Sequence, residues 1–150
     1  MAVLKKHWVP IHAPTLFKGE QLGESYVHET DTLKTRSISV NLMNITGDMK
    51  KQGFSVTFRI TDVKEGKART RVTGIEMQPG SLKRLVRRGR TKIDDSFLVQ
   101  LKGGQVARIK PLTITKSLTK NSTATAVRIR CREVLKEVCK ELNFETLVSD

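Results

Sequence analysis

Six cationic side chains fall within ten positions of the stretch SLKRLVRRGRTKIDD, residues 81–95, which ends in two aspartates. Like charges this close repel one another, so the folded protein tolerates them best when an anionic ligand neutralises them. No acidic residue occurs between Glu76 and Asp94, whereas a surface that serves only solubility mixes both signs. Guanidinium and ammonium groups at this density are suited to binding phosphate, and some of them can also complement a helix dipole. The six residues are Lys83, Arg84, Arg87, Arg88, Arg90 and Lys92.

The carboxylates Asp48, Asp94 and Asp95 are candidates for catalysis, because paired carboxylates can hold a metal ion or share a proton. Adjacent residues on a strand point to opposite faces, however, and nothing nearby completes a site. The three histidines show no ligand spacing. Cys131 and Cys139 lie eight residues apart in a helical pattern, roughly 12 Å, which is too far for a disulfide and fits no zinc pattern. We therefore expect no enzyme activity, no metal site and no cofactor.

The overall charge also indicates a polyanionic partner. Lys and Arg number 28 against 15 Asp and Glu in 150 residues, for a formal charge of +13 and a pI near 10.2. Aromatic residues make up 5%, and Phe54, Phe58 and Phe97 fall in the apolar phase of predicted strands. We expect the core to contain them, which disfavours recognition of single strands by base stacking and favours contact with the backbone and shape of a folded nucleic acid. The sequence begins without the apolar stretch of a signal peptide and has no run of about 20 apolar residues, so we expect a soluble intracellular protein.

Alternating apolar residues predict the strands that must position these groups. KEGK at residues 64–67 is typical of a tight turn, and Gly103-Gly104 of a two-residue hairpin turn. Pro111 would place the second strand of that hairpin at an edge or a bulge. The spacing of about five strands favours a mainly antiparallel sheet or a small barrel. The predicted strands cover residues 37–42, 54–60, 68–77 and the two halves of 96–115.

Two helices are predicted. A short helix over residues 81–88 would be anchored by Leu82, Leu85 and Val86 and would end near Gly89. A long helix over about residues 122–142 would bury one apolar face. That face is expected to contain Val127, Cys131, Val134, Leu135, Val138 and Leu142.

Residues 1–20 contain Pro10 and Pro14, which disfavour a helix and predict an extended N-terminal tail laid over a surface. Trp8 and Phe17 could hold it there. The expected organisation is therefore this basic tail followed by a single β-rich domain over residues 21–150, which ends in the long helix.

Several segments together resemble the archaeal and eukaryotic small-subunit ribosomal protein family eS-one, also called the S-three-Ae family. The resemblance rests on WVPIHAP (8–14), SISVNLMNITGD (37–48), SLKRLVRRGRTKIDD (81–95), SFLVQLKGGQVARIKPLTIT (96–115) and TAVRIRCREVL (125–135), in this order over nearly the whole chain. The chain departs from the family pattern in three places. Thr35 stands where the pattern has glycine, Asn44 stands where an acid is common, and the sequence of residues 116–123 differs from the usual one. Chains of the family tend to continue past the long helix, so we expect a C-terminal segment beyond Asp150.

This resemblance implies an α+β fold with a central antiparallel β-barrel-like sheet, flanking helices and the extended tail. It implies a structural component of the cytoplasmic small ribosomal subunit, on the platform near the messenger RNA exit, without catalysis. Its partners would be ribosomal RNA, neighbouring ribosomal proteins and messenger RNA near the exit. The candidate RNA contacts are Lys5, Lys6, Lys83, Arg84, Arg87, Arg88, Arg90, Lys92, Lys116, Lys120 and Arg128. Two alternatives stay open: a free RNA-binding translation factor or chaperone, and an enzyme acting on nucleic acid with Asp48, Asp94 and Asp95 as metal ligands.

Overall fold

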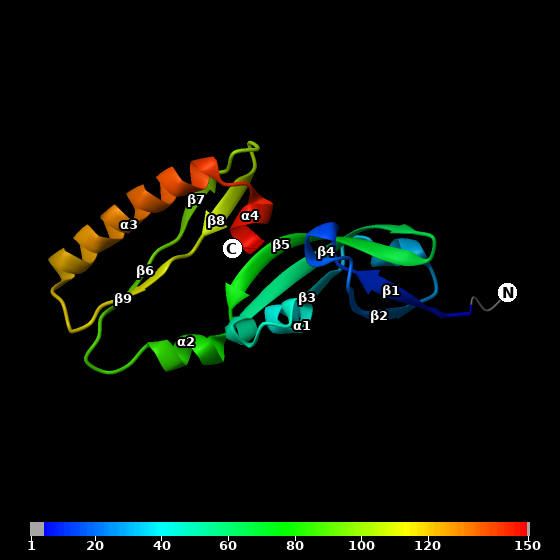
Figure 1. Cartoon of the computed structure of the whole chain (residues 1–150), viewed down its shortest axis with the longest axis horizontal. Coiled ribbons are helices and arrows are strands. Elements are labelled where there is room, and N and C mark those ends of the chain that lie inside the picture. Colours follow the sequence, from blue (N-terminus) through cyan, green and yellow to red (C-terminus); the bar gives the residue numbers. More distant parts are fainter. Residues whose placement is uncertain (1–4, 150) are drawn as a thin grey trace. The chain divides into compact units, whose positions relative to one another are not determined.

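A computed structural model describes residues 5–149 and shows an α+β chain made of two compact units, one ending at Ser81 and the other beginning at Leu82 (Figure 1). Each unit has a hydrophobic core of its own. The expectation of a single domain over residues 21–150 concerns how these units act together and stays a prediction.

The first unit is a five-stranded mixed sheet with the strand order β2-β1-β5-β4-β3. The one parallel pairing recorded in this sheet joins β1 to β5, and the other neighbours are antiparallel. The strands are β1 (His7–His12), β2 (Gln21–Val27), β3 (Ser37–Asn41), β4 (Phe54–Lys64) and β5 (Lys67–Met77). Short helical segments connect them: η1 (Thr15–Phe17), η2 (Thr30–Leu33), α1 (Leu42–Thr46) and η3 (Met49–Gly53).

The predicted hairpin between β4 and β5 is confirmed. Glu65 and Gly66 both have positive φ, 54° and 72°, as a two-residue turn that matches the strand twist requires. Val56, Phe58 and Ile60 alternate with exposed or half-buried residues on β4, so the period-2 pattern buries one face of the strand. Phe17 packs edge-on against Phe58 with ring centroids 5.6 Å apart.

The prediction of an N-terminal tail differs from the structure, because residues 7–12 form an internal strand of this sheet. Val9 and Ile11 point into the core with 0% and 5% of their surfaces exposed. The sequence predicted an extended tail instead of a strand here because of Pro10 and Pro14. Pro10 is tolerated because β1 pairs with β5 only at Ile11 and His12, so Pro10 has a recorded ladder partner in β2 alone, Glu24.

Thr35 occupies a backbone conformation that a β-branched residue rarely adopts. Its φ is +74°, in the left-handed region where glycine is the usual residue. The Thr35 amide donates to the Ile60 carbonyl at 3.1 Å, which fixes the chain between η2 and β3 in this conformation. The departure at Thr35 therefore places strain where glycine would have none.

The barrel-like closure is not found in the described residues, where β2 and β3 are the two edges of an open sheet. The prediction from the sequence placed the strands after residue 90 and the earlier strands in one sheet. Those strands pair among themselves in the second unit, because the residues between the two sets form a helix and a loop rather than a short turn.

In the second unit, the long helix α3 (Asn121–Glu141) runs beside two short antiparallel strand pairs, β6 with β9 and β7 with β8 (Figure 1). Its core contains Val99 and Leu101 against Cys139, with residues of the final helix packed around them. The predicted hairpin is confirmed, but the two-residue turn expected at Gly103-Gly104 is wrong: residues 101–105 connect the two strands, and Gly104 in this loop has a φ of +74°. The remaining elements are α2 (Pro79–Leu85), β6 (Lys92–Asp94), β7 (Phe97–Gln100), β8 (Val106–Ile109), β9 (Leu112–Ile114) and α4 (Phe144–Ser149).

The bounds predicted for α3 agree with the structure to within one residue, but the predicted buried face is partly wrong. Val134 and Val138 are 41% and 48% exposed, whereas Cys139 is only 2% exposed. The buried stripe follows the i, i+4 series that ends at Cys139, which places the two valines on its flank. Burial also raises the pKa of the Cys139 thiol, as expected for a small apolar core residue.

Candidate nucleic-acid interface

The basic cluster lies on α2 and on the loop that follows it. Lys83 and Arg84 are in the last turn of the helix, and Arg87, Arg88 and Arg90 lie in the loop at residues 86–91. All five side chains are exposed. Gly89 has a φ of +80°, so it forms a turn within this loop rather than the end of the helix, which ends at Leu85.

The expected apolar anchor of this helix is wrong. Leu85 and Val86 are 46% and 37% exposed, and no residue of α2 is buried. The start of the helix is held by polar contacts instead: the Gln78 amide donates to the Gly53 carbonyl at 2.8 Å, and its side-chain amide donates to the Ser55 hydroxyl at 3.2 Å.

Thr91 joins the cluster to a second basic segment that is distant in the sequence. Its hydroxyl accepts a hydrogen bond from the Thr119 amide at 3.0 Å, and its carbonyl accepts one from the Thr115 amide at 3.1 Å. The Thr91 amide in turn donates to the Thr115 hydroxyl at 2.9 Å. Lys116 and Lys120 directly follow these two threonines, so the fold brings both exposed lysines next to the segment that contains Arg90.

Most of this charge is unpaired. Within residues 5–149, no ion pair or hydrogen bond is recorded for the side chains of Lys83, Arg84, Arg87, Arg88, Arg90, Lys116 and Lys120. Lys92 differs, because its ammonium group lies 2.9 Å from the Asp94 carboxylate. This pair is exposed to solvent and leaves Lys92 only weakly neutralised.

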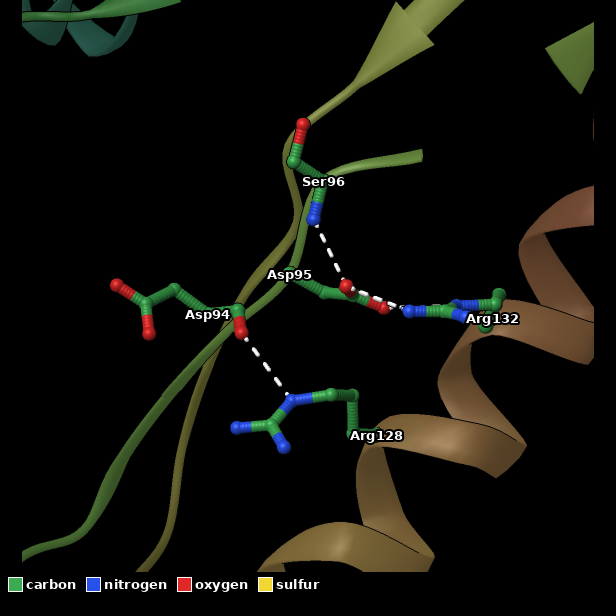
Figure 2. A network of polar contacts seen from close by, with 5 residues as sticks. All are labelled: Asp94, Asp95, Ser96, Arg128 and Arg132. Carbon is green, nitrogen blue, oxygen red and sulfur yellow. Dashed lines mark hydrogen bonds and ion pairs between the residues drawn. The ribbon is translucent and has the colours of Figure 1, made fainter. Parts of the chain in front are cut away.

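The two adjacent aspartates have structural partners and point in different directions (Figure 2). Asp95 accepts two hydrogen bonds from the Arg132 guanidinium, at 2.9 and 2.8 Å, and one from the Ser96 amide at 2.8 Å. The hydrogen bond from Arg132 is the main cause that holds the pKa of Asp95 below its usual range. The hydrogen bond from Lys92 lowers the pKa of Asp94 in the same direction.

Arg128 and Arg132 connect α3 to the strand that leads out of β6. Arg128 donates from Nε to the Asp94 carbonyl at 3.3 Å, and Figure 2 shows both arginines reaching from the helix towards the aspartates. Arg132 also lies over the Phe97 ring, 5.5 Å from its centroid. Arg128, expected as an RNA contact, therefore has at least one role inside the unit. Its contact with RNA stays a prediction.

Lys5 and Lys6 belong to the first unit, directly before β1, and both are exposed. The Lys6 ammonium group lies 5.8 Å from the centroid of the Tyr26 ring. Tyr26 in turn packs against Trp8 with ring centroids 4.8 Å apart. Trp8 and Tyr26 are 63% and 50% exposed, an aromatic surface that the sequence did not reveal because Tyr26 and Trp8 lie eighteen positions apart.

The described residues contain no group of three or more His, Cys, Asp or Glu side chains placed to hold a metal ion. Asp48 is occupied in capping η3, where it accepts a hydrogen bond from the Lys50 amide at 2.9 Å. None of the helices between residues 5 and 149 combines the length and apolar character needed to span a bilayer.

The sequence profile of the ribosomal S3Ae family matches residues 2–150. The chain therefore belongs to this family of ribosomal proteins. Its relatives include two proteins named small ribosomal subunit protein eS1, from Nanoarchaeum equitans (strain Kin4-M) and Methanothermobacter thermautotrophicus (strain ATCC 29096 / DSM 1053 / JCM 10044 / NBRC 100330 / Delta H). They are 32% and 31% identical over 96% of this chain and over 73% and 74% of their own lengths. Another of the same name, from Desulfurococcus amylolyticus (strain DSM 18924 / JCM 16383 / VKM B-2413 / 1221n), is 32% identical over 97% of this chain and 68% of its own length. Family membership confirms the resemblance noted in the sequence and supports a structural, non-enzymatic role.

Proposed function

We propose that this protein is a structural constituent of the small ribosomal subunit that binds folded ribosomal RNA through the basic cluster and the segment joined to it at Thr91. Its place there is the platform near the messenger RNA exit, in the cytoplasm, beside neighbouring ribosomal proteins. The observation that carries the proposal is the junction at Thr91, which brings two exposed, unpaired basic segments into one surface.

The geometry favours phosphate contacts over recognition of bases at this surface. Arginine side chains on a loop can form two parallel hydrogen bonds with phosphate oxygens, and such contacts position a protein on RNA whatever its sequence. The two threonine amides that donate to Thr91 are satisfied inside the protein, so the threonines support the surface while the lysines beside them remain available.

A free RNA-binding factor with the same cluster is the alternative, and the names of the relatives favour the ribosomal assignment over it. Sedimentation separates the two. A ribosomal constituent stays with small subunits in a sucrose gradient after a high-salt wash, whereas a free factor is released.

The central test reverses two charges in the middle of the cluster, Arg87→Glu with Arg88→Glu. Both side chains are exposed and lie beyond the end of α2, so the unfolding free energy is expected to change by less than about 1 kcal/mol. We expect this variant not to be incorporated into small subunits that are reconstituted with it as the only source of this protein, because repulsion of phosphate replaces attraction. The variant Arg87→Gln with Arg88→Gln is expected to bind with intermediate affinity.

A matched control reverses two exposed charges on α3, Lys136→Glu with Lys140→Glu, and is expected to leave incorporation unchanged. For about six phosphate contacts, the logarithm of the binding constant should fall against the logarithm of salt with a slope of roughly −4 to −5. Normal incorporation of the Arg87 and Arg88 double variant would refute the proposal that this cluster binds the RNA. A slope near −1 would do the same.

A further inference from the structure

The outer face of the first unit's sheet carries an exposed aromatic pair at one end. Trp8 on β1 lies directly opposite Tyr26 on β2, and their ring planes are tilted by 35°. More than half of Trp8 is open to solvent, and Lys6 places a positive charge over Tyr26. A large apolar surface exposed beside a cation is suited to stacking with a planar, electron-rich group such as a nucleobase.

Three arginines continue the same face away from the aromatic pair. In the parallel register, Ile11 lies beside the buried Ala68 and His12 beside Arg69. Because side chains alternate along a strand, Trp8 and Arg69 both lie on the face opposite the core.

Arg71 is two residues beyond Arg69 on the same side of β5, and it lies directly opposite Arg59 on β4. Like charges placed directly across two strands destabilise a sheet. Arg59, Arg69 and Arg71 are exposed, and none has an ion pair among the described residues. One acid lies directly opposite an arginine of this face: Asp62 on β4 faces Arg69 across the strand pair, and its carboxylate forms an ion pair with Lys64 at 3.5 Å. Glu24 and Glu76 lie opposite Pro10 and Ser55.

These groups lie along a path that is long enough for a short extended strand of RNA. Trp8 and His12 are four residues apart, and Arg71 is two residues further along than the partner of His12. At about 3.3 Å per residue, the path from Trp8 to Arg71 is roughly 20 Å long, sufficient for a few nucleotides of a single strand. A duplex would keep its bases stacked inside and leave the aromatic pair unused, and an acidic peptide would offer charge without a base.

We propose that this outer face is a second RNA-binding surface that takes an unpaired segment, with a base stacked on Trp8 and Tyr26 and phosphates bound by Arg59, Arg69 and Arg71. The inference rests on the proposed function for the identity of the ligand as RNA. It also differs from the expectation that disfavoured base stacking, because that expectation rested on Phe54, Phe58 and Phe97 and not on this exposed pair.

Trp8 is the only tryptophan of the chain, so its intrinsic fluorescence reports on this surface alone. The test titrates the full chain with an octamer of uridine and, separately, with a duplex RNA of the same length. The single strand is expected to quench the fluorescence, and the duplex to quench it far less. Trp8→Ala is expected to weaken binding of labelled octamer, followed by anisotropy, on the order of 10-fold, whereas Trp8→Phe retains a ring and most of the affinity.

Arg59→Gln with Arg71→Gln should reduce both the quenching and the salt dependence, while Arg108→Gln on β8, an exposed arginine outside this face, serves as the matched control. Circular dichroism confirms that each variant is folded. Equal quenching by the duplex, or displacement of the octamer by polyglutamate at equal charge, would overturn the proposal. So would unchanged affinity of folded Trp8→Ala.

The charge reversal at Arg87 and Arg88 separates this inference from the proposed function. Quenching by the octamer is expected to survive that change, because the two surfaces lie in different units. Loss of ribosomal incorporation with quenching retained supports both proposals. Normal incorporation with quenching retained refutes only the role of the basic cluster, and absent quenching in the unmodified chain refutes only the second surface.

Discussion

Replacing Val9 by Ala tests whether β1 is part of the sheet or a tail laid over it. Val9 is 0% exposed and belongs to the cluster that also contains Val27, Leu33 and Ile60. The change removes two buried methyl groups, which contribute about 1.6 kcal/mol at roughly 0.8 kcal/mol each. A residual cavity of about 40 Å³ adds about 1 kcal/mol at 24 cal/mol per Å³, for a total of roughly 2 to 3 kcal/mol.

The assay is urea or thermal unfolding of the full chain, followed by native-state hydrogen exchange at residues 7–12. For a unit of this size each kcal/mol lowers the melting temperature by about 4 to 8 °C, so the first unit's transition should fall by roughly 10 to 20 °C. Val106→Ala makes the same chemical change at a position that is 61% exposed and is expected to cost less than about 0.5 kcal/mol.

In the unmodified protein, amides of β1 that bond to β2 are expected to exchange as slowly as those of β5. A tail that orders only on its partner would behave otherwise. A cost below about 0.5 kcal/mol for Val9→Ala, together with fast exchange across residues 7–12, would show that β1 is not held in the isolated protein and that its place in the sheet is wrong.

Three further outcomes are expected. Asp95→Asn should lower the unfolding free energy of the second unit. This loss should have its full size above the ordinary pKa near 3.8 and should disappear as the pH falls through the lower pKa that Asp95 has in the folded state. A difference in urea unfolding that does not depend on pH would contradict the role of the Arg132 pair. Thr35→Gly should raise the unfolding free energy by roughly 1 kcal/mol, because it relieves the positive φ, and a loss in the same measurement would show that the site is not strained. Thr91→Val should leave every charge in place yet weaken RNA binding severalfold, because the Thr119 amide loses its acceptor, and undiminished affinity by filter binding would mean that the junction does not organise the surface.

Local patterns predicted local structure well. The alternation at residues 54–60 and the turn at Glu65 and Gly66 are properties of a few neighbouring residues, and both are confirmed. The bounds of α3 also follow from its own periodicity. Its buried face does not, because the strands against which the helix packs decide which of two adjacent apolar stripes is covered, and their position is not encoded within the helix.

Pairing between distant segments could not be read in this way. The first strand was mistaken for a tail because Pro10 and Pro14 disfavour a helix and the sequence of this extended segment does not show which strand it pairs with. Pro10 is acceptable in the sheet because β1 has only limited pairing with β5. The prediction of a barrel-like sheet was wrong for a related reason. Periodicity identifies a strand but not the strand beside it, so strands of two separate units were assigned to one sheet.

In the candidate site too, the sequence shows which residues are present but not which residues they contact. Every cation of the cluster was visible in the sequence, but the acid that pairs with Lys92 and the backbone contact of Arg128 were not. Without those two residues, the surface around Thr91 offers seven unpaired cations in the described chain: Lys83, Arg84, Arg87, Arg88, Arg90, Lys116 and Lys120. At roughly 0.7 to 0.9 per phosphate contact, seven cations support a salt slope no steeper than about −6. A measured slope steeper than this in the binding of ribosomal RNA therefore requires cations from elsewhere, and the exposed arginines on the outer face of the first unit's sheet are one group that could supply them.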